Sequence, residues 1–368
     1  MKILFITNVP SPYRVDFFNE LGKLCDLTVL FEKQTSTERD KSWSNYKFNN
    51  FKGVFLKGLS VRVDKAWCRG YKKYLKDKSY DAIVCCSYSS PTGMAMISYM
   101  RRHKIKYFME GDGGFAKTGK GLKEKIKKYF IKGACGYFST AKIHDEYYLT
   151  YGADKNKLHR YPFTSLFEKD ILPKLPTKEE KKHLREELGI KSKKVLLAVG
   201  QFIPRKGFDV LLKAMKDLSK DIGVYFVGGE PTAEYINLKQ EFGLENVNFI
   251  GFKNKEELKK YYIAADVFVL PTREDIWGLV INEAMANGLP IISTDRCIAA
   301  LELVKDGENG CVVPVNDVAA LTTAIKKVLE DDEVCLKMGN ESLKKIREYT
   351  FENMAKRHIE VFEAFKED

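Results

Sequence analysis

Short apolar runs alternate with longer amphipathic segments along the whole chain. Runs such as 3–6 and 195–199 have the length and the β-branched content of buried strands. The segments between them place apolar residues at helical spacing. Because strands and helices alternate in this way, the pattern predicts an α/β fold with mainly parallel sheets that are covered on both faces.

The pattern divides into two halves that are separated by an irregular stretch, 162–178, which holds three prolines and resembles a linker. In the first half we expect strands over 2–7, 26–31, 53–57, 81–86, 105–109, 135–139 and 157–161, and helices over 12–24, 65–78, 92–102, 120–131 and 142–151. In the second half we expect strands over 194–199, 222–227, 246–250, 266–270, 290–293 and 310–313, and helices over 206–218, 232–242, 255–264, 278–286, 317–330, 334–347 and 351–365. A length of 368 residues also suggests two domains.

The segment 266–290 carries the clearest chemistry. An apolar strand ends at Pro271, an acidic loop follows, and a helix begins near Gly278. Asp275 lies in the loop and Glu283 within the helix. Both carboxylates can face a ligand beyond the carboxyl end of the strand, where ligands of open α/β sheets bind. Free N–H groups at the start of the helix suit an anion.

A second turn, after the strand 194–199, holds two adjacent cations, Arg205 and Lys206, directly before a helix. Hydrogen bonds between charged groups and phosphate are strong, so this turn suits a phosphorylated ligand. No Gly-x-Gly-x-x-Gly follows the first strand, which disfavours a dinucleotide-binding dehydrogenase.

The acidic segment resembles the donor-binding motif of retaining glycosyltransferases of family 4. In that motif two acidic residues, separated by seven others, are followed by Ala-Met-Ala and Gly-x-Pro, as at 284–286 and 288–290 here. The resemblance implies that Glu283 holds the ribose of a nucleotide and that Asp275 contacts the donor sugar. Asp275 stands where the family usually has Glu, and Glu274 is the alternative contacting acid.

The resemblance also implies roles for the turns around this motif. Lys206 matches the lysine that contacts the diphosphate, while Gln201 stands where the family usually has Arg, so we expect Arg205 to supply the missing charge. The remaining residues expected to contact the donor are Gly229, Phe252, Lys253, Ile276, Trp277, Gly278 and Leu279.

For the whole chain, the resemblance implies the GT-B architecture, in which two Rossmann-like domains have parallel sheets that face each other across a central cleft. Residues 1–165 would then form an acceptor-binding domain and residues 166–350 a nucleotide-sugar-binding domain. The last helix, 351–368, would cross back to the first domain.

Four residues are candidates for the acceptor side. Tyr13 and Arg14 follow the first strand and offer a stacking face and a positive charge; a helix entry with an incidental aromatic is the alternative. Glu110 and Asp112 follow another strand and offer carboxylates for hydroxyl groups, unless they only form a glycine-rich turn. The sequence does not decide whether Glu110 or Asp112 is catalytic.

Residues 117–132 form a lysine-rich segment in which Leu122, Ile126, Tyr129 and Phe130 share one helical face. Such a helix can lie on an anionic membrane, or it can pack its apolar face on the protein as an ordinary surface helix. The net charge of +12 likewise suits polyanions or anionic lipid headgroups.

The cysteines have no metal-ligand spacing, so we expect reduced thiols and no metal site. No apolar run is long enough to cross a bilayer, and the first strand is too short to be a signal peptide. These features predict a cytoplasmic protein that is peripheral on the inner face of the plasma membrane.

The resulting hypothesis is a retaining transferase that moves a sugar from a UDP-linked donor to a lipid-linked or polysaccharide acceptor in cell-surface glycan biosynthesis, without a cofactor. A GT-B-fold sugar-nucleotide epimerase or phosphorylase is the first alternative. A basic nucleic-acid-binding protein is the second, and it is disfavoured because the chain shows neither stacking aromatics among its lysines nor a groove-fitting motif.

Overall fold

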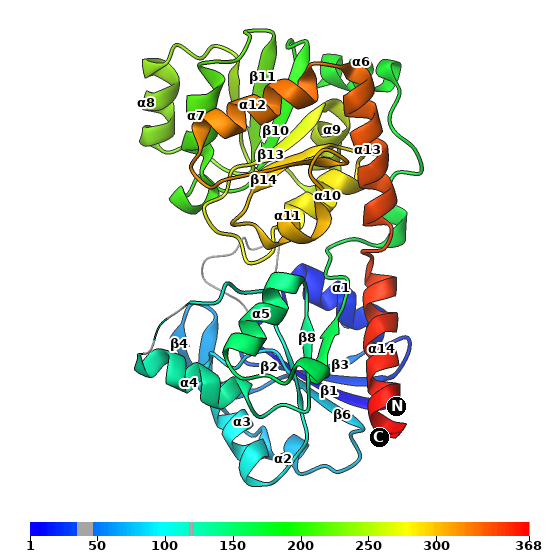
Figure 1. The fold of residues 1–368 in the computed structure, drawn as a ribbon. Coiled ribbons are helices and arrows are strands. Elements are labelled where there is room, and N and C mark those ends of the chain that lie inside the picture. Colours follow the sequence, from blue (N-terminus) through cyan, green and yellow to red (C-terminus); the bar gives the residue numbers. More distant parts are fainter. Residues whose placement is uncertain (35–46, 118, 120, 368) are drawn as a thin grey trace. The chain divides into compact units, whose positions relative to one another are not determined.

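The computed structural model describes residues 1–34, 47–117, 119 and 121–367. The chain divides into two compact units, Met1–Thr164 together with Thr350–Asp368, and Ser165–Tyr349 (Figure 1). Each unit is built around its own parallel sheet, as the alternating pattern predicts. The division falls beside the predicted boundary, and the last helix belongs to the first unit.

The first unit contains a seven-stranded sheet in the order β3-β2-β1-β6-β7-β8-β9, in which all neighbouring strands are parallel. Its strands are β1 (Lys2–Thr7), β2 (Asp26–Phe31), β3 (Lys52–Phe55), β6 (Ala82–Cys85), β7 (Phe108–Glu110), β8 (Gly136–Ser139) and β9 (Leu158–Arg160). Its helices are α1 (Pro12–Leu21), α2 (Lys72–Leu75), α3 (Pro91–Arg102), α4 (Leu122–Ile131), α5 (Lys142–Thr150), η2 (Lys155–Lys157) and α14 (Phe351–Glu367). Residues 118 and 120, at the start of the predicted basic helix, and Asp368 lie outside the described residues.

Helix α14 is fixed to this sheet by an aromatic cluster. The ring of Phe362 lies 5.3 Å from that of Phe108 on β7 and 5.4 Å from that of Phe138 on β8, both in edge-to-face geometry. Phe362 is buried, and α14 also packs along α1. The C-terminal segment therefore completes the core of the first unit, although the whole second unit separates it from that core in sequence.

The predicted helix 65–78 is wrong. Residues 57–69 form an antiparallel hairpin of β4 (Lys57–Arg62) and β5 (Lys65–Arg69), and only the short α2 follows. Along β5, Ala66 and Cys68 are buried while Trp67 is exposed, so burial alternates with the period of a strand. This alternation covers only five residues, and the basic residues among them fit helical spacing as well, so the sequence alone did not indicate a strand.

The second unit contains a six-stranded parallel sheet in the order β12-β11-β10-β13-β14-β15. Its strands are β10 (Lys194–Val199), β11 (Ile222–Val227), β12 (Val247–Ile250), β13 (Val267–Leu270), β14 (Ile291–Thr294) and β15 (Gly310–Val313). Its helices are η3 (Glu168–Asp170), α6 (Lys178–Glu187), η4 (Pro204–Lys206), α7 (Phe208–Met215), α8 (Ala233–Glu241), α9 (Lys255–Ala264), α10 (Leu279–Ala286), α11 (Ile298–Leu303), α12 (Val318–Leu329) and α13 (Asp332–Ile346). The sequence pattern did not predict α11, which is a short helix and largely buried.

In neither unit does the described part of the chain contain a helix that is long and apolar enough to span a bilayer.

Replacing Phe362 with Ala should destabilise the first unit by about 3–5 kcal/mol, the usual cost of truncating a buried phenylalanine. Chemical denaturation measures this loss directly. The exposed neighbour Glu363 is the matched control, since its replacement by Ala should change stability by less than about 0.5 kcal/mol. Equal effects of the two substitutions would show that α14 does not complete this core.

Candidate functional site

The centre of the second sheet is a topological switch point. Strand β10 lies between β11, which leads to one edge, and β13, which leads to the other. All the strands are parallel, so the loops that follow β10 and β13 leave side by side from the same edge of the sheet. Open α/β sheets bind ligands in the crevice at such a point.

These two loops are fastened to each other. The Thr272 hydroxyl donates to the carbonyl oxygen of Arg205 at 2.8 Å, and the backbone N–H of Arg273 donates to the same oxygen at 2.7 Å. Gly207 has a φ of 67°, and a Cβ there would lie 2.0 Å from the carbonyl oxygen of Pro271. Glycine is therefore required both by the left-handed backbone and by the close approach of the second loop.

A partly buried ion pair that the sequence did not reveal holds the same two loops together. Arg273 donates from Nη1 and Nη2 to the two carboxylate oxygens of Asp209 on α7, at 2.9 and 2.7 Å. Burial raises the pKa of Asp209, but Arg273 outweighs it and holds this pKa below the usual value. Bidentate pairs of this kind fix geometry as well as charge.

The predicted cations and one predicted acid meet above this junction. Lys206 Nζ lies 2.7 Å from Asp275 Oδ2, and Arg205 Nη1 lies 3.4 Å from Asp275 Oδ1. Glu274, the alternative acid, directs its carboxylate to Arg296 at 3.3 Å instead, and only its carbonyl oxygen accepts from Arg205. Asp275 is thus the acid that faces the cations.

The start of α10 is built on a tight turn. Gly278 has a φ of 105°, and a Cβ there would lie 2.8 Å from Cys297 Sγ. The Trp277 indole is buried and donates to the Asn282 side chain at 2.8 Å, so its ring supports the turn. By contrast, the side chain of Ile276 is exposed, and Leu279 is the first residue of the helix.

Glu283 lies farther along α10 and has different partners. Its carboxylate accepts hydrogen bonds from the Tyr262 hydroxyl at 3.0 Å and from the Ser165 hydroxyl at 3.4 Å. Burial raises the pKa of this carboxyl group. The structure brings together Arg205, Lys206 and Asp275, but it records no contact between Glu283 and these three side chains.

The other predicted donor contacts lie at the same edge of the sheet, in the loops after β10, β11 and β12. Gln201 is exposed, Gly229 has open space where a Cβ would stand, and the Phe252 ring is exposed. Lys253 Nζ lies 3.8 Å from a carboxylate oxygen of Glu257. Their contact with a nucleotide stays a prediction.

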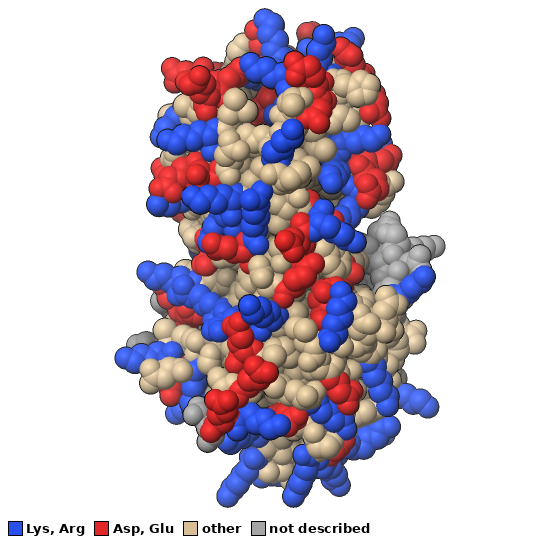
Figure 2. Space-filling view, turned by 90° about the vertical axis from the view of Figure 1, so that its right-hand side faces the viewer, with Lys and Arg blue, Asp and Glu red and all other residues tan. Residues whose placement is uncertain are grey.

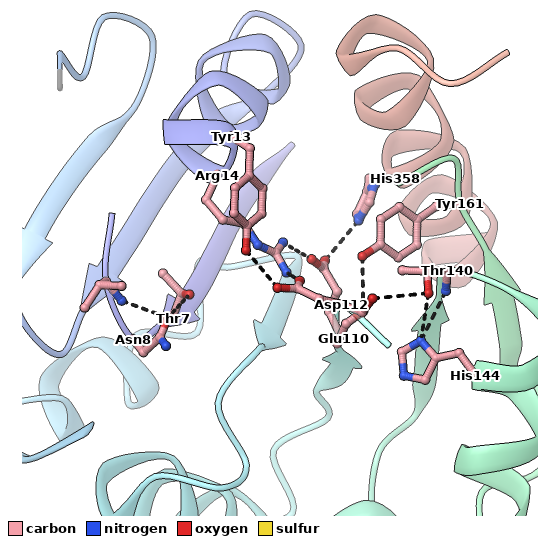
Figure 3. A network of polar contacts seen from close by, with 12 residues as sticks. Thr7, Asn8, Tyr13, Arg14, Glu110, Asp112, Thr140, His144, Tyr161 and His358 are labelled. Atoms are coloured by element: carbon pink, nitrogen blue, oxygen red, sulfur yellow. Dashed lines mark hydrogen bonds and ion pairs between the residues drawn. The ribbon is translucent and has the colours of Figure 1, made fainter. Parts of the chain in front are cut away.

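The predicted acceptor-side residues form one polar network in the first unit (Figure 3). Arg14 on α1 pairs with both Glu110 and Asp112, and the Tyr13 hydroxyl donates to Asp112 Oδ2 at 2.8 Å. Arg14 and Glu110 are fully buried, whereas Tyr13 and Asp112 are partly exposed. Of the four, therefore, Tyr13 and Asp112 have solvent-accessible surface, and their contact with an acceptor stays a prediction.

Glu110 also reaches the C-terminal helix. Its Oε2 lies 3.0 Å from Nε2 of His358 on α14, and His358 Nδ1 lies 2.8 Å from the carbonyl oxygen of Met354. Burial raises the pKa of Glu110, but the Arg14 guanidinium and the His358 ring outweigh it and hold this pKa at about 2. The sequence analysis found no role for His358, because nothing local in the sequence signals a partner on a distant strand.

His144 on α5 lies next to the same network and contacts Thr140. Its Nδ1 accepts a hydrogen bond from the backbone N–H of Thr140 at 3.2 Å, and the ring stacks on Tyr148. Because it is buried, the pKa of His144 falls to about 3. A neutral ring is therefore part of the folded state at neutral pH.

Among the described residues, no group of three or more His, Cys, Asp and Glu side chains is arranged so that it could hold a metal ion.

Comparison with known proteins agrees with the geometry of the second unit. A family model described as glycosyl transferases group 1 matches residues 180–345, a range that includes Lys206, Asp275 and Glu283. The resemblance to glycosyltransferases found in the sequence is thus confirmed at the level of group 1, while membership of family 4 stays a prediction.

The group 1 segment has many relatives. A GDP-mannose-dependent alpha-(1-6)-phosphatidylinositol monomannoside mannosyltransferase of Mycolicibacterium smegmatis is 34% identical over 176 residues, which are 45% of this chain and 46% of the relative. A D-inositol 3-phosphate glycosyltransferase of Corynebacterium efficiens is 32% identical over 179 residues, 45% of this chain and 42% of that protein. The chain thus spans about half the length of the curated relatives it matches.

Solved structures match the chain over nearly its whole length. Sucrose-phosphate synthase from Thermosynechococcus elongatus has a TM-score of 0.77 at 19% identity and covers 99% of both chains. Anabaena Alr3699/HepE, in a complex with UDP, has a TM-score of 0.78 at 16% identity and covers 99% of this chain and 100% of its own. These matches confirm the predicted GT-B fold class.

Replacing His144 with Asn should flatten the dependence of stability on pH below about 6.5. The unfolded chain binds a proton at its histidine below that pH, whereas the folded state does not until about pH 3. The wild type should therefore lose about 1.4 kcal/mol of unfolding free energy per pH unit through this group as the pH falls, and the variant should not.

Urea denaturation between pH 7 and pH 5 measures this difference, with the exposed His103 replaced by Asn as the control. Parallel pH profiles of the wild type and the His144 variant would contradict a neutral, buried His144.

Proposed function

We propose that the protein is a retaining glycosyltransferase that uses a nucleotide-diphosphate sugar. The observation that carries the proposal is the meeting of Lys206, Arg205 and Asp275 at the switch point of the second sheet. Two cations beside one carboxylate suit a ligand that presents a diphosphate next to hydroxyl groups. The group 1 match over 180–345 and the names of the relatives support the same class of reaction.

A bound diphosphate would replace Asp275 as the partner of Lys206. Phosphate oxygens carry more charge than one carboxylate, and they can accept from Arg205 as well. Asp275 would then be free to accept hydrogen bonds from the hydroxyl groups of the sugar. The ion pair between Lys206 and Asp275 therefore holds both side chains ready for the two parts of the donor.

In the proposed reaction the bond between the anomeric carbon and the oxygen of the diphosphate breaks, and negative charge grows on that oxygen. Lys206 and Arg205 stabilise this charge, which lowers the barrier. The acceptor hydroxyl attacks from the same face and gives its proton to the departing phosphate. No protein nucleophile is then needed.

Glu283 is proposed to hold the ribose. Its partly buried carboxylate already accepts hydrogen bonds from two hydroxyl groups, those of Tyr262 and Ser165. Ribose hydroxyls present the same chemistry. We propose a UDP-linked donor. One solved neighbour, Anabaena Alr3699/HepE, is known in complexes with UDP and with UDP-glucose, while one relative is named for GDP-mannose, so donors of both kinds belong in the test.

For the acceptor we propose a lipid-linked or polysaccharide glycan, approached through Tyr13 and Asp112, with the first unit on an anionic membrane. Three apolar residues of α4 face solvent: Leu122 is 74% exposed, and Ile126 and Tyr129 are exposed as well, whereas Phe130 is partly buried against the core. Only Ile131 of this helix is buried. These exposures favour the membrane-surface alternative over a packed surface helix.

Charge is divided unequally between the units in a way that supports this placement. The first unit carries 34 Lys and Arg against 20 Asp and Glu, whereas the second carries 28 against 30. On the face seen in Figure 2, Lys and Arg side chains project from the edge of the first unit, while both signs are mixed over the second. The positive charge of the protein therefore belongs to the unit that carries α4.

A cytoplasmic location, peripheral on the inner face of the plasma membrane, is part of the same proposal. It is supported by the eight cysteines, all of which are free thiols in the described structure.

Replacing Lys206 with Ala should lower kcat by about 10²- to 10³-fold, because a group that stabilises charge in the transition state is lost. Replacing Arg205 with Ala should raise the KM for the donor and also lower kcat. Release of nucleotide from a panel of UDP- and GDP-sugars, with a glycan acceptor, measures both effects. Lys216, an exposed lysine at the end of α7, is the matched control, and its replacement by Ala should leave both constants unchanged.

Unchanged kinetics of the Lys206 variant would remove this lysine from the site. A new sugar nucleotide formed from donor alone would instead indicate an epimerase, and sugar phosphate formed from a glycan and inorganic phosphate would indicate a phosphorylase.

A further inference from the structure

The hairpin β4–β5 exposes an apolar patch that the fold of the first unit does not need. Leu59 is 75% exposed and Trp67 is 44% exposed, and the two are directly opposite each other in the strand register. Opposite residues of an antiparallel pair lie on the same face, so their side chains are neighbours. Val61, at the irregularity near the end of the hairpin, is also exposed.

The opposite face of the hairpin is anchored, and this fixes the direction of the patch. The backbone N–H of Cys68 donates to the Thr92 hydroxyl at 2.8 Å, and that hydroxyl donates to the carbonyl oxygen of Ala66 at 2.6 Å. Lys33 Nζ donates to the Ser60 hydroxyl and to the carbonyl oxygen of Val63. Trp67, between Ala66 and Cys68, is therefore held outward.

Cations surround the patch. Lys57 lies opposite Arg69 in the strand register at one end of the hairpin, and Arg62 lies opposite Lys65 at the other end. Asp64 is the single acidic residue within 57–69. An apolar centre with a basic rim matches an anionic bilayer, whose interface accepts tryptophan and whose headgroups accept lysine and arginine. An exposed two-stranded hairpin with apolar side chains would otherwise be an aggregation liability.

We propose that the hairpin β4–β5 is a second membrane-contact element of the first unit: Leu59, Val61 and Trp67 enter the interfacial region of an anionic bilayer, and the rim cations contact its headgroups. The occupant is a lipid surface and not another protein, because the unit that bears the hairpin holds all of the net positive charge. Helix α3 packs against both β5 and α4, so the hairpin and the proposed membrane helix contact the same element of the first unit.

This inference does not depend on sugar transfer, and it is tested without donor or acceptor. The full chain is mixed with vesicles of phosphatidylcholine alone or of phosphatidylcholine with phosphatidylglycerol, and binding is measured by flotation. The hairpin variant L59S/W67S should bind the anionic vesicles roughly tenfold more weakly or worse, because two apolar side chains no longer leave water. A control variant, L24S/L149S, removes two other exposed leucines of the same unit and should bind as the wild type does.

Tryptophan fluorescence gives a second readout at the site itself. Of the three tryptophans, Trp277 is buried and Trp43 lies outside the described residues, so the Trp67→Phe variant assigns the signal. A blue shift on anionic vesicles that disappears in this variant places Trp67 in the lipid interface. The thermal shift produced by UDP, measured in parallel, should be the same in the hairpin variant and the wild type, which separates this proposal from the proposed donor site.

Two results would overturn the proposal. The first is unchanged vesicle affinity of L59S/W67S while the α4 variant L122S/I126S loses binding. The second is a change from dimer to monomer, seen by light scattering of L59S/W67S, with vesicle binding intact, since the patch would then bind a second copy of the chain.

Discussion

The ion pair between Lys206 and Asp275 is the interaction on which the functional account depends. It joins two loops that leave adjacent parallel strands at the switch point, and both side chains are nearly buried. A buried charge without a partner is costly, so each side chain holds the other in place. The bracing by Arg273 and Asp209, and the close approach at Gly207, leave the two loops little freedom to separate.

In the first unit, a different network of buried polar contacts links segments that are distant in sequence. Arg14, Glu110 and His358 come from α1, β7 and α14, and their buried contacts tie the C-terminal helix to the sheet. The two members of the predicted acceptor set that remain partly exposed, Tyr13 and Asp112, are held by the same network. The structure thus separates residues that fix the unit from residues that can meet a ligand.

The sequence predicted the parts of the fold that depend on local pattern. Strands β10 and β13 are continuous apolar runs, and the turns after them carry Lys206 and Asp275, so both the elements and the cluster could be expected. The second strand of the hairpin, β5, was predicted as part of a helix over 65–78 because its alternation of buried and exposed residues covers only five positions. The partners of His358 and Arg273 could not be predicted, since contacts between distant segments leave no periodic signal.

Family resemblance supplied what the residue pattern lacked. The pattern alone places two carboxylates and two cations at one sheet edge, and the group 1 match over 180–345 is the ground on which a sugar nucleotide is proposed as their ligand. The structure adds that Asp275, and not Glu274, faces the cations, and that Glu283 has its own hydroxyl partners. A donor would therefore contact these acids at two separate positions, one near the diphosphate and the other at Tyr262.

A crystal structure with a bound UDP-sugar is the most direct test of the central claim. The account predicts that Lys206 Nζ and the Arg205 guanidinium contact the diphosphate, while Asp275 turns from Lys206 to a sugar hydroxyl and Glu283 accepts from the ribose. A diphosphate bound elsewhere, with the ion pair between Lys206 and Asp275 intact, would contradict it.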